Sequence, residues 1–349
     1  MTTIVNVAAR GDLFLRAIST HRVLISLSLF HVMSALGVSL LLGVPFRASA
    51  VPILMLLFKV LVPVFMILIM FAHFFHLAIW VRPPNPARRF LADARDTLLD
   101  PERLVAGGAA LLSISVFCGS FTFLKETIPV MNPFSWDPLF AGLDRALHGG
   151  YDPYVLVMQV FGTPFLTTVL NAAYHFWFFL LYFIVFMCCF WKGQPALRHT
   201  FLIAYVLTWT IGGNVMATVF SSVGPVYYDF FGFGADFKPL VGTLHQFAET
   251  SPVWALDVHQ MLLDAYRDGR GISGISAMPS MHVATAVLMA VFGFGLNRWV
   301  GWALTAFAVV TMIGSVHLAW HYAIDGYVGA AVAVACWWLA RKLARHEAY

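Results

Sequence analysis

Charged residues are scarce in this 349-residue sequence: they make up 11% of it, whereas hydrophobic residues make up 60%. So little charge cannot cover the surface of a soluble protein, which excludes a water-soluble fold. Cysteine is also scarce, at four residues, which excludes a disulfide scaffold. The net charge of +4 is too small to indicate nucleic acid as a partner. Aromatic residues are abundant, at 15%, which excludes a disordered chain and leaves an integral membrane protein.

Eight apolar stretches are long enough to cross a bilayer, which takes about 20 helical residues for about 30 Å of hydrocarbon. We therefore expect an all-α integral membrane protein with about eight transmembrane helices. The stretches cover residues 23–44, 51–81, 104–124, 168–191, 201–220, 281–296, 300–316 and 322–340. We divide the chain into residues 1–103, an N-terminal two-helix addition with a basic cytoplasmic loop, and residues 104–349, which hold the last six helices.

The distribution of basic residues predicts the orientation. Fourteen Lys and Arg residues lie on the side of the N-terminus and six on the other side. The positive-inside rule then places both termini in the cytoplasm. Two long loops, residues 125–167 and 221–280, fall on the extracytoplasmic face, where we expect the active site. In the first loop, residues 139–147 carry apolar side chains at helical spacing and predict a short helix along the interface.

Three ionisable residues near the C-terminus predict a catalytic site. The segment Ser276-Ala-Met-Pro-Ser-Met-His282 opens the sixth span, and His321 and Asp325 lie where the seventh span joins the eighth. Because the sixth span descends and the seventh returns, the three side chains share one mouth. His321 and Asp325 are four residues apart and therefore fall on one face of a helix, so the carboxylate can orient the imidazole as a nucleophile. Ser280 can cap the sixth helix, whose N-terminus attracts an anion such as phosphate.

Other readings of these residues are open. His317, His321 and Asp325 lie at i, i+4 and i+8, a spacing that resembles a two-histidine, one-carboxylate metal site. A transporter or scramblase can also use intramembrane His and Asp for proton coupling, and a non-catalytic assembly protein needs none of them aligned. The ionisable residues gather at one mouth instead of forming a path across the membrane, which favours an enzyme.

Two short motifs resemble those of a known enzyme family. Pro279-Ser280-Met281-His282 resembles the Pro-Ser-x-His motif of the type 2 phosphatidic acid phosphatase superfamily, and His321-x3-Asp325 resembles the end of its next motif. The resemblance covers about residues 104–340 and implies a six-helix core. It also implies a reaction without metal or cofactor, in which His321 attacks phosphorus, Asp325 orients it and His282 protonates the leaving oxygen.

The departures from that family narrow the resemblance. The first motif, Lys-x6-Arg-Pro, is absent, and Ser315 stands where the third motif has an arginine. Ser222-Val-Gly-Pro-Val-Tyr-Tyr228 takes the place of the first motif and looks like the inositol phosphorylceramide synthase branch, which transfers a head group between lipids. We therefore expect a lipid phosphatase or phosphotransferase whose partners are a lipid phosphoester and, for a transferase, a lipid or polyol alcohol. The expected substrate-binding residues are Ser280, Tyr227, Lys238, Arg267, Arg270 and Ser315.

Overall fold

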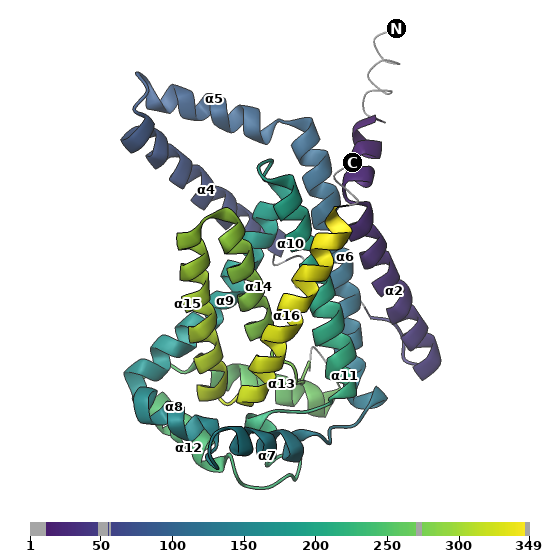
Figure 1. Ribbon diagram of the computed structural model, residues 1–349, viewed down its shortest axis with the longest axis vertical. Coiled ribbons are helices and arrows are strands. Elements are labelled where there is room, and N and C mark those ends of the chain that lie inside the picture. The colour runs from purple at the N-terminus through teal and green to yellow at the C-terminus, as the bar shows by residue number, and fades with distance from the viewer. Residues whose placement is uncertain (1–11, 48–54, 56, 270–273, 346–349) are drawn as a thin grey trace.

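The computed structural model describes residues 12–47, 55, 57–269 and 274–345, and every regular element among them is a helix (Figure 1). Seven of these helices are long and apolar enough to cross a bilayer, and an eighth apolar helix, α14 (Met281–Leu296), is shorter at 16 residues. The prediction of an all-α membrane protein with about eight spans is confirmed. The seven long spans are α2 (Arg22–Leu42), the α4 region (Lys59–Val81), α6 (Pro101–Met131), α9 (Pro164–Phe190), the α10 region (Pro195–Val219), α15 (Arg298–His317) and α16 (Ala323–Ala344).

Helix α6 extends further than the sequence pattern indicated. It begins after the N-cap Asp100, whose carboxylate accepts the N–H groups of Glu102 and Arg103, and it ends at Met131. The predicted span stopped at residue 124 because the apolar run stops there. The helix continues through the charged residues Lys125 and Glu126, so Lys125 belongs to α6 and not to the loop that follows it.

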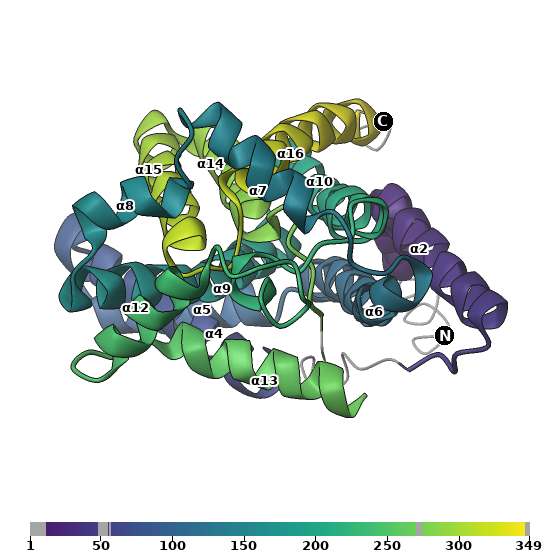
Figure 2. The same cartoon turned by 90° about the horizontal axis from the view of Figure 1, so that it is seen from below.

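Four shorter helices cover one end of the bundle, which we call the loop end. Figure 2 shows them lying across the ends of the long helices. They are α7 (Asp137–Leu147), α8 (Pro153–Phe161), α12 (Lys238–Ala248) and α13 (Trp254–Asp268). The short helix predicted for residues 139–147 is present as α7. Helix α5 (Pro86–Leu98), the turn between α14 and α15 and the end of α16 lie at the opposite end (Figure 1).

Helix α2 belongs to the bundle although it lies in the N-terminal part of the chain. Leu24 is buried in the main apolar core. His31, about two turns further along α2, is buried too, and its Nδ1 lies 2.7 Å from the hydroxyl of Ser120 in α6. The second ring nitrogen lies 2.9 Å from the side-chain oxygen of Asn214 in the π-helical segment η3 (Trp209–Met216). These bonds satisfy a histidine that would be costly at membrane depth. The division of the chain at residue 104 stays a prediction.

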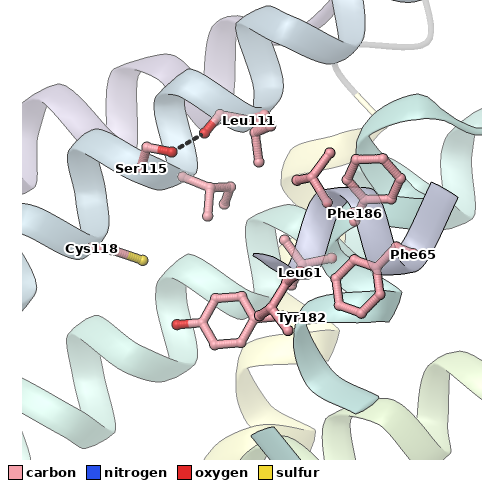
Figure 3. Close-up of a pocket in the computed structure, with 10 residues that line it drawn as sticks. Leu61, Phe65, Leu111, Ser115, Cys118, Tyr182 and Phe186 are labelled. Carbon is pink, nitrogen blue, oxygen red and sulfur yellow. Dashed lines mark hydrogen bonds between the residues drawn. The ribbon is translucent and has the colours of Figure 1, made fainter. Parts of the chain in front are cut away.

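Helix α4 (Val62–His76) lies between two π-helical turns, η1 (Leu57–Leu61) and η2 (Leu77–Val81). It packs less closely against the bundle than α2 does. Its buried side chain is Phe65, which is 1% exposed. Phe65 contacts three rings of α9, with ring centroids 5.1–5.8 Å apart. Beside Phe65, a slot opens between α4, α6 and α9 (Figure 3).

Close packing joins the starts of α14, which contains His282, and α16, which follows His321. A Cβ added to Gly329 in α16 would lie 2.5 Å from the carbonyl oxygen of Ser280. The backbone N–H of Ser280 donates to the carbonyl of Asp325 at 2.9 Å. The missing side chain therefore lets the two helices approach until their backbones hydrogen-bond, which fixes the ends that carry His282 and Asp325.

Candidate active site

A cavity of about 380 Å³ opens at the loop end of the bundle. Its walls come from α6, α9, η3 and α13, from the segment that holds Val223 and Tyr227, from α14 and the loop before it, and from the loop between α15 and α16. His282 and His321 both line it, and we call it the histidine cavity. Most of its other lining side chains are aromatic or aliphatic: Phe121, Tyr174, Trp177, Phe178, Trp209, Val223, Tyr227, Val258, Leu262, Ile275, Met281 and Trp320.

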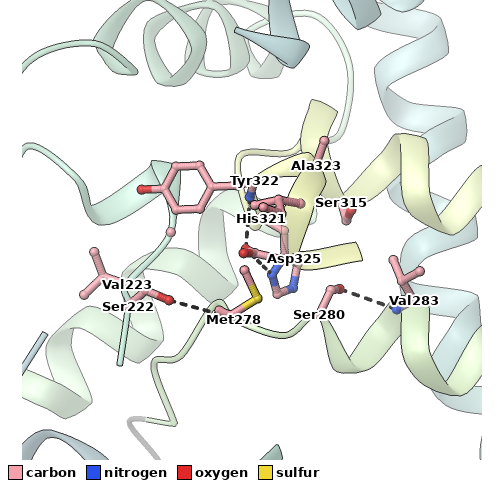
Figure 4. Close-up of polar contacts among 12 residues, drawn as sticks. Ser222, Val223, Met278, Ser280, Val283, Ser315, His321, Tyr322, Ala323 and Asp325 are labelled. Atoms are coloured by element: carbon pink, nitrogen blue, oxygen red, sulfur yellow. Dashed lines mark hydrogen bonds and ion pairs between the residues drawn. The ribbon is translucent and has the colours of Figure 1, made fainter. Parts of the chain in front are cut away.

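His321 lies in the loop between α15 and α16, and its Nδ1 is 3.3 Å from a carboxylate oxygen of Asp325 (Figure 4). The same oxygen accepts the backbone N–H of Tyr322 at 3.0 Å, as part of the capping box at the start of α16. The two side chains therefore meet at a helix cap. The spacing had predicted a contact along one continuous helical face. Because Nδ1 faces Asp325, Nε2 is the ring nitrogen available for chemistry.

Asp137, in the first turn of α7, holds the loop that carries His321. Its carboxylate accepts the hydroxyl of Tyr322 at 2.8 Å and the N–H groups of Val223 and Gly224 at 2.9 Å each. Burial raises the pKa of Asp137, and these hydrogen bonds act in the opposite direction. One buried carboxylate thus ties together α7, the Ser222–Tyr228 segment and the loop that carries His321.

Asp144 lies seven residues after Asp137, about two turns further along α7, and it caps α16. Its two oxygens accept the N–H groups of Ala323 at 2.6 Å and Ile324 at 2.9 Å. A carboxylate at a helix N-terminus satisfies free donors and matches the helix dipole. The short helix predicted from its amphipathic pattern therefore also has a positioning role, since it fixes the helix turn that presents Asp325.

His282 lies in the first turn of α14 and faces His321 across the cavity, with ring centroids 6.3 Å apart. Its ring stacks on Tyr174 at 4.3 Å and packs against Trp177 at 4.0 Å. Two aromatic rings therefore fix its orientation. The gap between the two imidazoles leaves space for a phosphorus centre between a nucleophile and a proton donor.

Lys125 also lines the histidine cavity, and it is not among the substrate-binding residues predicted from the sequence. It comes from α6 and lines the cavity beside both histidines, on which its charge acts. Within the described residues it makes no hydrogen bond or ion pair, and no carboxylate perturbs it. A partly buried ammonium without a counter-ion is costly unless an anion occupies the site. Lys125 therefore marks where a phosphate would lie.

Unpaired hydrogen-bonding groups surround the same space. Four residues that line the cavity each carry a buried polar atom that has no hydrogen-bond partner among the described residues: the hydroxyls of Tyr174 and Ser276 and the indole N–H groups of Trp209 and Trp320. Buried polar groups in proteins are normally paired, and each unpaired one costs about 1–3 kcal/mol. Since all four can donate, their common arrangement suits a ligand rich in acceptor oxygens, as a phosphoester is.

Burial and the charge of Lys125 lower the pKa of His321 to about 3, while a hydrogen-bonding contribution from the backbone of Ala277 acts in the opposite direction. The imidazole is therefore neutral at neutral pH and keeps a lone pair for attack. An anion bound at Lys125 would offset the charge of the ammonium group. The basicity of His321 would then rise when a substrate phosphate binds.

Three of the predicted substrate-binding residues lie next to the cavity, with differing side-chain roles. The hydroxyl of Ser280 accepts the N–H of Val283 as the N-cap of α14. Ser315 is fully buried, and its carbonyl accepts the N–H groups of Trp320 and His321, both at 3.1 Å. Only Tyr227 lines the cavity with its side chain, and its hydroxyl donates to the carbonyl of His259 at 2.9 Å.

The predicted loop cations lie elsewhere. Lys238 pairs with Asp229 at 3.0 Å, and both side chains are more than half exposed. The guanidinium of Arg267 lies over the ring of Phe230, 4.6 Å from its centroid. Neither residue is among those that line the histidine cavity. Arg270 lies outside the described residues.

The alternative metal-ligand set is not assembled. Helix α15 ends at His317, and α16 begins only at Ala323, so the i, i+4, i+8 spacing does not fall on one helix. The Nε2 atom of His317 lies 2.8 Å from the hydroxyl of Thr167 on α9. In the part of the chain that the structure describes, no three His, Cys, Asp or Glu side chains converge as a metal site would require.

Comparison with known proteins adds a family. A family model described as the PAP2 superfamily matches residues 139–339, which is more than half of the chain. The matched region contains α7 from residue 139 onward, both cavity histidines and Asp325, whereas α2, α4 and α6 lie outside it. Comparisons with curated proteins and with solved structures gave no significant match.

Proposed function

The chain belongs to the PAP2 superfamily, and on that premise we propose that it cleaves or transfers a lipid phosphoester through a phosphohistidine on His321. The observation that carries the proposal is the arrangement in the histidine cavity. An unpaired lysine, an imidazole oriented by a carboxylate and a second imidazole line one space, together with four residues whose buried donors have no partner among the described residues. A phosphoester there meets a nucleophile, a proton donor and an anion site at once.

In the first step, the lone pair on Nε2 of His321 attacks phosphorus, and the bond from phosphorus to the leaving oxygen breaks. His282, when protonated, gives its proton to that oxygen. The phosphoimidazole carries a positive charge, which Asp325 stabilises through Nδ1–H. Lys125 and the unpaired donors stabilise the charge that develops on the phosphoryl oxygens.

In the second step, water or an alcohol attacks phosphorus, His282 takes the proton from the attacking oxygen, and the bond from phosphorus to Nε2 breaks. Water makes the protein a phosphatase, and an alcohol makes it a phosphotransferase. We propose head-group transfer similar to that of the inositol phosphorylceramide synthase branch, on the basis of the Ser222–Tyr228 segment. That segment packs on the catalytic loop, since Val226 N–H donates to the Ala319 carbonyl at 2.9 Å.

Gly224 in this segment supports the same reading. Its φ is +84°, a backbone conformation that residues other than glycine rarely adopt. A Cβ at this position would lie 2.5 Å from the carbonyl oxygen of Trp320. The Gly-Pro-x-Tyr segment therefore fits directly against the residue before His321. The Ser222–Tyr228 segment, which takes the place of the missing basic motif, thus supports the loop that carries His321 through close backbone packing and not through charge.

We also propose that both termini are cytoplasmic and that the histidine cavity faces the extracytoplasmic side. The distribution of Lys and Arg supports this orientation. Beneath the cavity, Trp177 and Met281 border an apolar core that includes Leu181, Leu288 and Met289. A cavity with an apolar floor favours a site open at one end over the polar passage that a transporter needs.

The direct test is turnover of a panel of lipid phosphomonoesters and phosphodiesters by the purified full-length chain, with and without alcohol acceptors, followed by mass spectrometry of the lipids. We expect turnover of lipid phosphoesters that is lost in His321→Asn. Acceptor-dependent exchange products would establish the transferase, and free phosphate alone would establish the phosphatase. Turnover restricted to water-soluble phosphates would contradict the lipid assignment.

A further inference from the structure

A third histidine lines the histidine cavity and takes no part in the two steps described above. His175, on α9, lines it together with Tyr174 and Trp177 of the same helix. The ring of His282 packs against these two aromatic rings, with centroids 4.3 Å from Tyr174 and 4.0 Å from Trp177. Since His175 lies between them in the chain, it belongs to the wall of α9 on which His282 rests.

Two contacts fix the ring of His175. Its Nδ1 lies 2.8 Å from the carbonyl oxygen of Asn171, one turn earlier in α9. The side chain of Asn171 is buried and accepts the N–H of Ala255 at 3.1 Å, which ties this turn to the start of α13. Trp254, the first residue of α13, packs edge-on against the His175 ring, with centroids 6.0 Å apart. The ring is therefore held in place before any substrate binds.

The contact with Asn171 decides which nitrogen of His175 can meet a ligand. A carbonyl oxygen only accepts hydrogen bonds, so Nδ1 carries the hydrogen. In the neutral imidazole, Nε2 then has a lone pair and acts as an acceptor. Among the described residues this nitrogen has no hydrogen-bond partner, and His175 is only partly buried. His175 thus brings an unused acceptor to the cavity wall.

The phosphate of a substrate does not suit this acceptor. Ionised phosphate oxygens accept hydrogen bonds themselves, so they match the ammonium group of Lys125 and the unpaired donors described above. A donor for Nε2 of His175 has to come from another part of the substrate. The alcohol part can supply one, as a hydroxyl or an amide N–H beside the phosphoester oxygen. Because His282 serves that oxygen and rests on the same wall of α9, such a donor is brought towards His175.

We propose that Nε2 of His175 accepts a hydrogen bond from a second hydroxyl or an amide N–H on the alcohol part of the substrate, beside the oxygen that His282 protonates. This inference rests on the proposed function and adds its substrate class: phosphoesters of alcohols that carry a second donor on the neighbouring carbon. Since His282 serves both the leaving and the attacking oxygen, both alcohols occupy the same place. His175 therefore selects the alcohol in both steps, without forming a bond or moving a proton.

The test uses two lipid phosphates that differ by a single hydroxyl. Lysophosphatidic acid has a free hydroxyl on the carbon next to the phosphoester carbon, and its 2-deoxy analogue with the same acyl chain lacks it. We expect the parent protein to turn over lysophosphatidic acid with a kcat/KM about tenfold higher, because a site that pairs a substrate hydroxyl rejects the analogue without it. In His175→Phe this preference should be lost, while kcat/KM for the deoxy analogue stays within about twofold of the parent value.

Two further variants separate recognition from packing. His175→Gln keeps an acceptor oxygen near the position of Nε2 and should retain part of the preference. His245→Phe, on α12, replaces an exposed histidine that does not line the histidine cavity and should retain all of it. Equal turnover of the two phosphates by the parent, or an equal loss for both in His175→Phe, would overturn the inference while the proposed function stands. No turnover of any lipid phosphoester by the parent would instead contradict the proposed function.

A binding measurement needs no turnover and therefore also serves if the parent turns over only phosphodiesters. Non-hydrolysable phosphonate analogues of the two lipids are titrated into the full-length protein. We expect the hydroxyl-bearing phosphonate to bind the parent about tenfold more tightly than the deoxy phosphonate, and both to bind His175→Phe equally. Equal affinities in the parent, or a preference that persists in His175→Phe, would overturn the inference. Binding of neither phosphonate would count against the histidine cavity as the phosphate site.

Discussion

The two cavities on α6 and α9 differ in how their polar groups are satisfied. At the histidine cavity, Lys125 has no counter-ion among the described residues, and four lining residues carry buried donors that have no partner among them either. In the slot beside Phe65 between α4, α6 and α9, one turn away, Ser115 and Cys118 both have partners within the protein. An unpaired buried polar group is costly, and a bound ligand is one way to satisfy it. The comparison favours the histidine cavity over the slot as the place where a polar, anionic group would bind.

The largest expected effect comes from Asp325→Asn. The amide oxygen can still accept the N–H of Tyr322, so the cap of α16 is kept, but the amide cannot stabilise a charged His321. We expect phosphoester turnover to fall on the order of 10³–10⁴-fold, as when a nucleophile's partner imposes the wrong tautomer. Phosphate release is the measurement. A parent-like rate in a folded variant would show that the carboxylate only caps the helix.

Lys125→Met should be the next most severe. It removes the cation without a large change in volume, so the transition-state charge on the phosphoryl oxygens loses its strongest partner. We expect kcat/KM to fall on the order of 10²-fold, with partial recovery in Lys125→Arg. Steady-state kinetics and the affinity for vanadate report this effect.

Lys238→Met is the matched control for Lys125→Met, because Lys238 pairs with Asp229 at the exposed surface. It should leave kcat/KM within about twofold of the parent value. If Lys238→Met is the more damaging of the two, the loop cation predicted from the sequence holds the phosphate, and the histidine cavity is not the anion site that its geometry indicates.

Two tyrosines sharpen the comparison through effects of opposite sign. Tyr174→Phe removes an unpaired buried hydroxyl, so we expect the free energy of unfolding to rise by about 1 kcal/mol while substrate binding weakens several-fold. Tyr182→Phe removes a hydroxyl that interacts with Tyr205, so we expect a loss of about 1 kcal/mol and little change in substrate binding. Thermal unfolding and KM are measured for both. Equal signs for the two stability changes would remove the distinction between the cavities.

Acidification tests the buried neutral histidines at the loop end. Burial and Lys125 lower the pKa of His321 to about 3, and burial, with His245 and His175 contributing, lowers the pKa of His259 to about 3, from an ordinary value of 6.5. Below pH 6.5 the unfolded chain takes up protons that the folded chain does not. Stability is therefore complete above pH 6.5 and is lost as the pH falls toward 3.

Melting temperatures measured between pH 7.5 and pH 4 check this prediction. We expect a decline below pH 6.5, and a shallower decline in His259→Gln, which removes one of the two groups. A melting temperature that does not change over this interval, or one that rises on acidification, would mean that these imidazoles are protonated in the folded protein.

The sequence alone was sufficient for the spans and for the meeting of His282, His321 and Asp325, because apolar length and helix direction decide both. The contact between His321 and Asp325 was expected from a continuous helix, and it arises instead from a capping box that a loop and a helix start share. Spacing predicts which residues are near each other more reliably than it predicts the backbone that joins them.

Lys125 was missed because the end of the apolar run was taken as the end of the helix. Its position at the same end of the bundle as His282 was a signal that the sequence offered. The roles of Asp137 and Asp144 had no such signal, since each bonds to backbone groups more than 80 residues away. The unpaired donors of the histidine cavity are equally invisible in the sequence, because being unpaired is a property of the packed structure.

Detection of the covalent intermediate tests the central claim most directly. The purified protein is mixed briefly with a lipid phosphate labelled with ³²P, quenched under alkaline conditions that preserve phosphohistidine, and digested for mass spectrometry. The account predicts a phosphoryl group on His321 that appears within one turnover, decays when unlabelled substrate is added and is absent from His321→Asn. Turnover of the lipid without any label on His321, or a label on another residue that persists in His321→Asn, would contradict the account.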